Sequence, residues 1–314
     1  MPRRLLSLLF LLTTLLPAAE FIRVRTTDGA TIEGTTAAKA LGKIPLTQIL
    51  SVHTGSPATD SETAKITAGL AAIQDKDRAA RDKAVDELTA IGLPVMTPLL
   101  KAYKDTDQHE PRPLYRLFER IMPSYADDFD RTLTLVRLAN GTAQRLPLPE
   151  GNLDILDATG ARTSLAWSKI RTLAVRQKTV KRTMQVHSLK HSTQIEFLDT
   201  GVILTPTSKA TLAAQGMVRL SWETDSWASD ATGIKVPGAP AYKSNLVDGF
   251  PFGSLVARVE PAGENFLIGK SANVSGKAGR LRLAVNDNAH WQNNLGTFYV
   301  SMTATDAYDM GDAQ

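Results

Sequence analysis

A short segment near the C-terminal end of the chain gathers side chains whose oxygen atoms could bind a hard cation. Asp287 and the adjacent pair Asn293 and Asn294 lie between two apolar runs. Calcium takes six to eight oxygen ligands from carboxylates, amide carbonyls and backbone carbonyls. These side chains could supply three of them, and the loop backbone or sugar hydroxyls could supply others. The alternative is that they form Asx turns joining two core strands.

Two further residues of the same loop have side chains that suit contact with a ligand. His290 and Trp291 lie between the carboxylate and the two amides. An indole ring combines a large apolar face with a polar edge, so a sugar ring can stack against it. We therefore take both as candidate ligand-binding residues, with a partly buried loop anchor as the alternative for Trp291.

The segment that contains this loop resembles the calcium-loop region of the PA-I-type galactose-binding bacterial lectins. Their pattern is an apolar strand, an Asn-Asp pair, a short loop, a pair of polar residues, a Gly and a second strand. The residues that fit it within Gly279–Met302 are Asn286-Asp287, Asn293-Asn294, Gly296 and Thr297-Phe298. Weaker landmarks upstream extend the similarity over about the last third of the chain.

The resemblance implies a lectin-like, jelly-roll-like β-sandwich in which Asp287, Asn293 and Asn294 ligate calcium. The leading expectation is therefore a protein that binds a glycan or another cell-surface polymer, with calcium as the candidate cofactor. The alternative is a non-catalytic structural or interaction protein of the cell envelope whose sandwich no longer binds sugar. A third, less favoured, reading is an accessory subunit of a polysaccharide-degrading system.

The sequence carries no residue pattern that is typical of an active site. It has no Cys, which excludes disulfides, zinc–thiolate sites, iron–sulfur clusters and thiol catalysis. The run Gly263–Ser271 has five residues between its glycines, where a phosphate-binding loop has four. His187 and His191 are four residues apart, but no third metal ligand follows them. We expect a protein that is not an enzyme.

Residues 1–19 have the pattern of a secretory signal peptide. Arg3 and Arg4 precede the apolar run Leu5–Leu16, and Pro17-Ala18-Ala19 offers a cleavage site. An apolar run of about 12 residues is shorter than the ~20 that span a bilayer. The mature chain is therefore expected to lack a transmembrane segment and to be periplasmic or secreted.

Two segments, 20–56 and 130–177, have the same order of strand and turn signals. A strand leads into Asp28-Gly29 in the first and into Asn140-Gly141 in the second, and both are hairpin turn signals. A β module of this length can hardly bury a core alone. We therefore expect the two copies to pair into one small barrel or sheet, with separate modules along the chain as the alternative. Each copy ends in a run with the same apolar positions, Ile44–Val52 and Leu165–Leu173.

Residues 60–125 between the copies have the period of amphipathic helices. Gly92 is expected to end one helix and Pro94 to begin the next, and Leu114–Met122 suggests a fourth. The segment 60–122 weakly resembles HEAT-like helical repeats. Because repeat stacks usually need three or more units, we expect a packed helical insert with a structural role. A groove that binds a partner is the alternative. The apolar positions with helical spacing are Ile66, Leu70, Ile73, Ala80, Ala84, Leu88 and Ile91.

The rest of the chain divides into a basic linker at 178–192, a lectin-like β-sandwich at 193–305 and an acidic tail at 306–314. Residues 158–195 contain eight basic residues and no acidic one. We expect a solvated linker face there, and contact with an acidic polysaccharide, a lipid headgroup or a cell-wall polymer is the alternative. Trp167 is the only aromatic residue of that stretch, which argues against nucleic acid.

The composition sets the fold class within which these segments must fit. The chain has 314 residues, of which 43% are hydrophobic, so wholesale disorder is excluded. Its net charge of +4 is too small to support a general affinity for nucleic acid. We expect a multidomain, mainly β protein. Small β modules flank a short helical insert, and a C-terminal jelly-roll-like β-sandwich follows.

Overall fold

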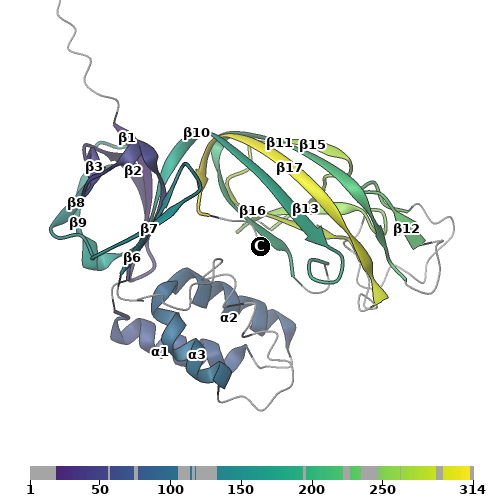
Figure 1. Cartoon of the computed structure of the whole chain (residues 1–314), viewed down its shortest axis with the longest axis horizontal. Helices are drawn as coiled ribbons and strands as arrows, with labels where there is room; N and C mark the ends of the chain where they lie inside the picture. The colour runs from purple at the N-terminus through teal and green to yellow at the C-terminus, as the bar shows by residue number, and fades with distance from the viewer. Residues whose placement is uncertain are drawn as a thin grey trace, which may run out of the picture.

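The structure is a computed structural model in which most of the chain forms β-strands (Figure 1). The described residues form one 15-stranded sheet, a small second sheet and the helices α1, α2 and α3. The expected mainly β class is confirmed. The residues that the structure describes are 19–55, 57–73, 77–104, 114, 117, 133–193, 196–221, 227–234, 247, 249–261, 263–287 and 293–311.

The two β modules pair into one unit, which we call the β lobe. The last strand of each copy pairs with the first strand of the other: β5 (Ile49–His53) with β6 (Thr134–Leu138), and β10 (Ile170–His187) with β1 (Glu20–Thr26). Apolar side chains of both copies share one core, which confirms the expected pairing. The remaining strands of the lobe are β2 (Thr31–Thr36), β3 (Ala40–Leu41), β4 (Ile44–Pro45), β7 (Ala143–Leu146), β8 (Asn152–Leu156) and β9 (Arg162–Ala166).

The repeated turn signals have the same structural effect in both copies. Asp28 and Asn140 each accept a hydrogen bond through Oδ1 from the backbone N–H two residues on. Gly29 and Gly141 adopt φ values of +91° and +84°, a region that L-residues with a side chain rarely enter. Each copy also has a 3-10 turn before its last strand, at Leu46–Gln48 and Trp167–Lys169.

The helical insert packs around its own core below the sheet (Figure 1). It consists of α1 (Asp60–Ala72), α2 (Arg78–Ile91), a 3-10 turn at Leu93–Val95 and α3 (Met96–Lys104). Gly92 ends α2 with φ +76°, as its position predicts. The buried side chains of Leu114 and Leu117 join this core. The other residues of the expected fourth helix lie outside the described residues, and the resemblance to HEAT-like repeats stays a prediction.

The third part, the sandwich lobe, is a curled antiparallel sheet wrapped around a second large core, consistent with a β-sandwich. Its strands follow the order β14-β13-β16-β11-β17-β10, and β12 and β15 also pair with β11. None of the described helices of the chain is both long enough and apolar enough to cross a membrane. The strands are β11 (Leu198–Arg219), β12 (Ala228–Ser229), β13 (Leu255–Glu260), β14 (Asn265–Leu267), β15 (Ser271–Ser275), β16 (Gly279–Val285) and β17 (Leu295–Asp309).

Two of the expected boundaries are wrong. Residues 178–187 of the expected basic linker belong to β10, and residues 306–309 of the expected acidic tail belong to β17, which ends at Asp309. Val180, Met184 and Val186 are buried at even positions of β10, which is the period-two burial of a regular strand. Arg182 lies on the same face and is half-buried, whereas Lys181 is exposed on the other face. Opposite charges on the two strands then pair. The ion pairs are Arg176–Asp306 and Arg182–Asp309.

The two lobes are therefore joined by continuous strand structure. β10 pairs with β1 in the β lobe through residues 170–175 and with β17 in the sandwich lobe through residues 176–187. The helical insert is tied to both lobes. Glu62 of α1 pairs with Arg171 of β10, and Asp86 of α2 pairs with Arg282 of β16 at 3.0 Å.

Candidate functional site

The predicted cation ligands lie where β16 ends and β17 begins, at one end of the sandwich lobe. Asp287 and Asn294 are each 1% exposed, although they come from opposite sides of the loop. The Asn294 side-chain Nδ2 donates a hydrogen bond to Oδ2 of Asp287. It donates a second one to the backbone carbonyl of Ser188, at 3.2 Å. The structure thus brings together two of the three predicted metal ligands.

A neighbouring segment holds the backbone of Asp287 in place. The Asp287 N–H donates to the hydroxyl of Thr193 at 3.0 Å, and that hydroxyl donates back to the Asp287 carbonyl at 3.0 Å. The N–H of Thr193 donates to the carbonyl of Val285 at 2.9 Å. The stretch that follows β10 therefore runs beside the end of β16 and holds the backbone of Asp287 in place.

Asn294 has one polar atom that its surroundings leave unsatisfied. Its Oδ1 is buried and has no hydrogen-bond partner among the described residues. Leaving a buried acceptor unpaired costs about 1–3 kcal/mol. A half-turn of the amide exchanges its oxygen and nitrogen. The oxygen would then face the Asp287 carboxylate and the Ser188 carbonyl, an all-oxygen set that suits a hard cation. In that orientation these residues would offer a calcium ion three of its six to eight oxygen ligands.

The structure describes only one of the other three predicted site residues. Asn293 is half-buried next to Asn294, and its part in the cluster stays a prediction. His290 and Trp291 lie outside the described residues. The described part of the chain contains no group of three or more His, Cys, Asp or Glu side chains that could hold a metal ion. A cation in the loop would therefore depend on amide and backbone oxygens as well as on Asp287.

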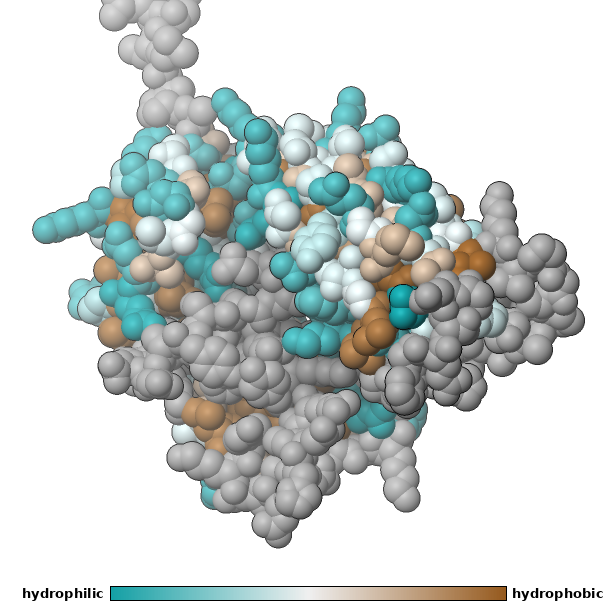
Figure 2. Space-filling view, turned by 45° about the vertical axis from the view of Figure 1, so that its right-hand side comes forward, coloured by the Kyte–Doolittle hydropathy of each residue, from teal (hydrophilic) through white to brown (hydrophobic). Residues whose placement is uncertain are grey.

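Exposed apolar side chains gather beside this loop. Leu189, Met217 and Leu295 are 42%, 61% and 46% exposed. They come from adjoining segments, since Met217 and Arg219 pair with Thr297 and Leu295 across β11 and β17, and the Ser188 N–H donates to the Gly296 carbonyl. Figure 2 shows apolar surface on this lobe. The polar cluster thus has apolar surface next to it.

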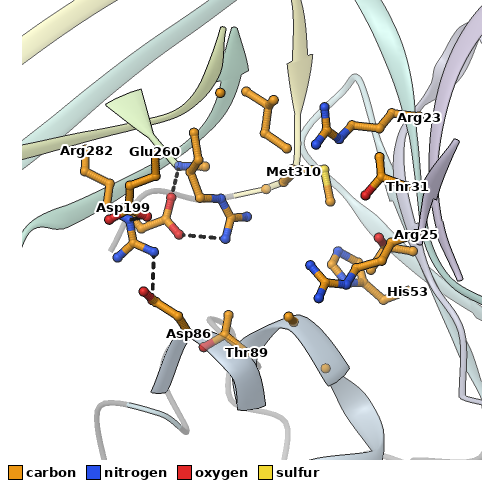
Figure 3. A pocket seen from close by; sticks show the side chains of 18 of the residues that line it. Arg23, Arg25, Thr31, His53, Asp86, Thr89, Asp199, Glu260, Arg282 and Met310 are labelled. Atoms are coloured by element: carbon orange, nitrogen blue, oxygen red, sulfur yellow. Dashed lines mark hydrogen bonds and ion pairs between the residues drawn. The ribbon is translucent and has the colours of Figure 1, made fainter. Parts of the chain in front are cut away.

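A second polar site, which the sequence reasoning missed, lies at the junction of the β lobe, the helical insert and the sandwich lobe (Figure 3). It is a cavity of about 320 Å³ with five arginines and three acidic residues in its wall. The acids are Asp86, Asp199 and Glu260, and the arginines are Arg23, Arg25, Arg137, Arg280 and Arg282.

A sequence signal for this cavity did exist. Arg23-Val24-Arg25 of β1 and Arg280-Leu281-Arg282 of β16 are two Arg-x-Arg runs, each with a buried apolar residue between its arginines. Alternation along a strand places both arginines of a run on one face. Only the fold shows that the two faces meet.

Comparisons with known proteins identify no family for this chain. No family model matches the sequence. No curated protein matches it either. Among solved structures, the chain is similar to one described as "EclA N-terminal domain; PllA-like lectin", at 23% identity and a TM-score of 0.31. That alignment covers 40% of this chain and 96% of the other. A TM-score of this size carries no argument about function.

Proposed function

We propose that this chain is an exported, non-enzymatic protein that binds a glycan or another cell-surface polymer through the loop end of the sandwich lobe. One observation carries the proposal: the buried Asp287 carboxylate meets the Asn294 amide, whose Oδ1 has no partner among the described residues. Export to the periplasm or beyond rests on the signal-peptide pattern of residues 1–19.

Calcium is the cofactor that this site would take, with Asp287, Asn293 and Asn294 as its side-chain ligands. The bound ion would supply a positive centre that accepts hydroxyl oxygens of a sugar. The chain's own residues position the ligands. Thr193 fixes the backbone of Asp287 through two hydrogen bonds of 3.0 Å, and the Ser188 carbonyl faces the same amide.

The surface beside the loop suits the apolar faces of a sugar ring whose hydroxyl groups contact the cation. A sugar ring has hydroxyl edges and apolar C–H faces, so it needs polar and apolar contacts side by side. The exposed side chains of Leu189, Met217 and Leu295 offer apolar surface beside the oxygen cluster. His290 and Trp291 of the loop are proposed as further contacts to the ring.

Calorimetry on the full chain tests calcium binding first. Wild-type protein is expected to bind calcium and to melt at a higher temperature in its presence, because a ligand at 100 times its Kd adds about 2.7 kcal/mol to stability. Asp287→Asn removes the only carboxylate of the site and is expected to abolish both effects. Asp230→Asn is the matched control, since Asp230 is a surface residue of the same lobe paired with Lys270 at 2.9 Å.

Sugar binding is then measured with galactosides, with and without calcium. Heat that depends on both sugar and calcium, and that Asp287→Asn abolishes, would support the proposal. No heat and no melting shift with calcium or galactoside would refute it and leave the structural or interaction protein of the envelope. The amide of Asn294 would in that case only donate to the Asp287 carboxylate and the Ser188 carbonyl and so close the loop.

A further inference from the structure

The cavity at the junction of the three parts has its acids on one wall. Asp86 and Glu260 pair with the buried Arg282 at 3.0 and 2.6 Å. Asp199 pairs with Arg280 at 3.1 Å. Figure 3 shows Asp86, Asp199, Glu260 and Arg282 together on one side of the open space. All three carboxylates in the wall are thus engaged by the arginines of β16.

The opposite wall carries positive charge without acids. Figure 3 shows Arg23, Arg25 and His53 on this side. Arg23 pairs with Glu33, which lies outside the cavity wall. Arg25 has neither a hydrogen-bond nor an ion-pair partner for its side chain among the described residues, and it is half-buried. Burial and the nearby guanidinium groups of Arg280 and Arg23 lower the pKa of Arg25.

Residues near the C-terminal end of β17 and the ring of His53 surround Arg137 at this wall. Arg137 lies against the backbone of Gly311, where a Cβ atom would come within 2.7 Å of its guanidinium. Gly311 in turn donates its N–H to Oδ1 of Asp309 at 3.0 Å. Burial, with Arg137 and Arg280 nearby, lowers the pKa of His53 to about 4, so this ring is neutral at neutral pH.

We propose that this cavity binds a doubly charged tetrahedral oxyanion, a phosphate or sulfate group carried by a small molecule. The wall has five arginines and three carboxylates, and Arg23 is also paired with Glu33 outside the wall, so the positive charge that a bound oxyanion would balance lies chiefly on Arg25. Guanidinium groups donate pairs of hydrogen bonds to such oxyanions. A tetrahedral group presents oxygens toward both walls, whereas a carboxylate presents its two oxygens in one plane. The volume of about 320 Å³ lies at the lower end of the ~300–1,000 Å³ that is usual for small-molecule sites.

The hydroxyl groups in the wall fit the same ligand class. Thr31 of β2 and Thr89 of α2 line the cavity on two different parts of the fold. Hydroxyl groups donate to phosphate and sulfate oxygens as readily as they do to carbonyls. A ligand here would contact all three parts of the chain, so its binding is expected to stabilise their junction.

The experiment is titration calorimetry of the full chain with inorganic phosphate and with sulfate, against chloride at the same ionic strength. Arg25→Gln is expected to weaken oxyanion binding about tenfold or more, the effect of losing a charge-assisted hydrogen bond. Arg162→Gln is the matched control, because Arg162 is an exposed residue of the same lobe outside the cavity, and it is expected to bind like wild type. A preference between the two probes identifies which group the ligand carries.

Two further measurements do not depend on the folding of Arg25→Gln. Asp199→Asn removes a negative charge from the wall and is expected to tighten oxyanion binding several-fold. NMR titration of wild type is expected to show that sulfate, which is still a dianion at this pH, raises the pKa of His53 from about 4. No saturable binding of phosphate or sulfate by wild type beyond that of chloride would overturn the proposal, and so would unchanged affinity in Arg25→Gln. Asp287→Asn is expected to bind the oxyanion with wild-type affinity. A negative result at the calcium loop can therefore be told apart from a negative result at this cavity.

Discussion

The ion pair between Glu62 and Arg171 is expected to determine how firmly the helical insert is attached. Both side chains are almost fully buried, at 3% and 1% exposure. Arg171 donates through Nε to Oε1 of Glu62 at 2.6 Å and through a terminal nitrogen to Oε2. That terminal nitrogen also reaches the Pro57 carbonyl at 2.7 Å. Glu62 additionally closes the capping box with Thr59 at the start of α1.

Glu62→Gln keeps the shape of the side chain and removes its charge. Arg171 would then be a buried cation without a carboxylate, and removing one partner of such a pair costs about 3–5 kcal/mol. The retained contact to Pro57 favours the lower end of this range. Because native proteins are stable by only about 5–15 kcal/mol, a loss of this size should be plain in urea unfolding followed by circular dichroism.

The pH dependence gives a second readout of the same pair. Burial raises the pKa of Glu62, but the hydrogen bonds from Arg171 and Thr59 outweigh it and hold the pKa below the ordinary value of 4.5. A depressed carboxyl pKa contributes stability above the unfolded-state pKa and loses it as the pH falls through the folded-state pKa. The difference between wild type and Glu62→Gln is therefore expected to be constant above about pH 5.5 and to shrink below pH 4.5.

Glu87→Gln serves as the control. Glu87 is an exposed residue of α2 whose contact with Lys83 is 3.9 Å long, so its loss should cost less than about 0.5 kcal/mol. If Glu62→Gln and Glu87→Gln unfold at the same urea concentration, the buried pair does not anchor the insert and the reasoning is refuted.

Three other outcomes are expected. Arg182→Met should destabilise the fold by about 1 kcal/mol or more, because it removes the cationic partner of the buried Asp309 carboxylate, whereas the exposed Lys178→Met should have little effect in the same urea assay. If the two variants lose the same amount of stability, the basic residues of β10 form a solvated face and the ion pair of Arg182 does not stabilise the strand. Gly34→Ala should cost about 2 kcal/mol or more in thermal unfolding, since its Cβ would lie 2.4 Å from a backbone carbonyl oxygen of β8; an unchanged melting point would contradict that approach. His53 should stay neutral in an NMR titration down to about pH 5, so that folding stability falls as the pH drops from 6.5 toward 4, where only the unfolded chain takes up the proton; a midpoint near 6.5 would contradict this.

The β lobe was predictable from the sequence because its signals are local and repeated. Asp28-Gly29 and Asn140-Gly141 predict hairpin turns, and the matching apolar runs at the ends of the two copies predict equivalent strands. A module too small to bury a core alone needs a partner, and the second copy is the available one. The same reasoning placed the end of α2 at Gly92.

The linker and the acidic tail were misjudged because charge density was given more weight than alternation. Arg176 and Arg182 are basic, but their acidic partners, Asp306 and Asp309, come about 130 residues later. A local sequence pattern cannot predict an ion-pair partner that lies so far away along the chain. The period-two burial of Val180, Met184 and Val186 was the signal that identifies a strand.

The calcium loop could be predicted from the sequence, whereas the arginine cavity could not. Asp287 and Asn294 are brought close by one loop, so their meeting follows from a local motif between two strands. The arginine cavity needs β1, β16 and α2 to converge from three parts of the fold. Its two Arg-x-Arg runs are present in the sequence, but only the tertiary arrangement brings Arg25 and Arg280 into the wall of one cavity.

The uninterrupted course of β10 has a practical consequence for dissecting the molecule. Two fragments, one that stops before β10 and one that starts after it, would expose the free edge of β1 on the first and that of β17 on the second, each with a row of unpaired backbone groups. Such edges invite aggregation, so neither fragment should be well behaved in isolation.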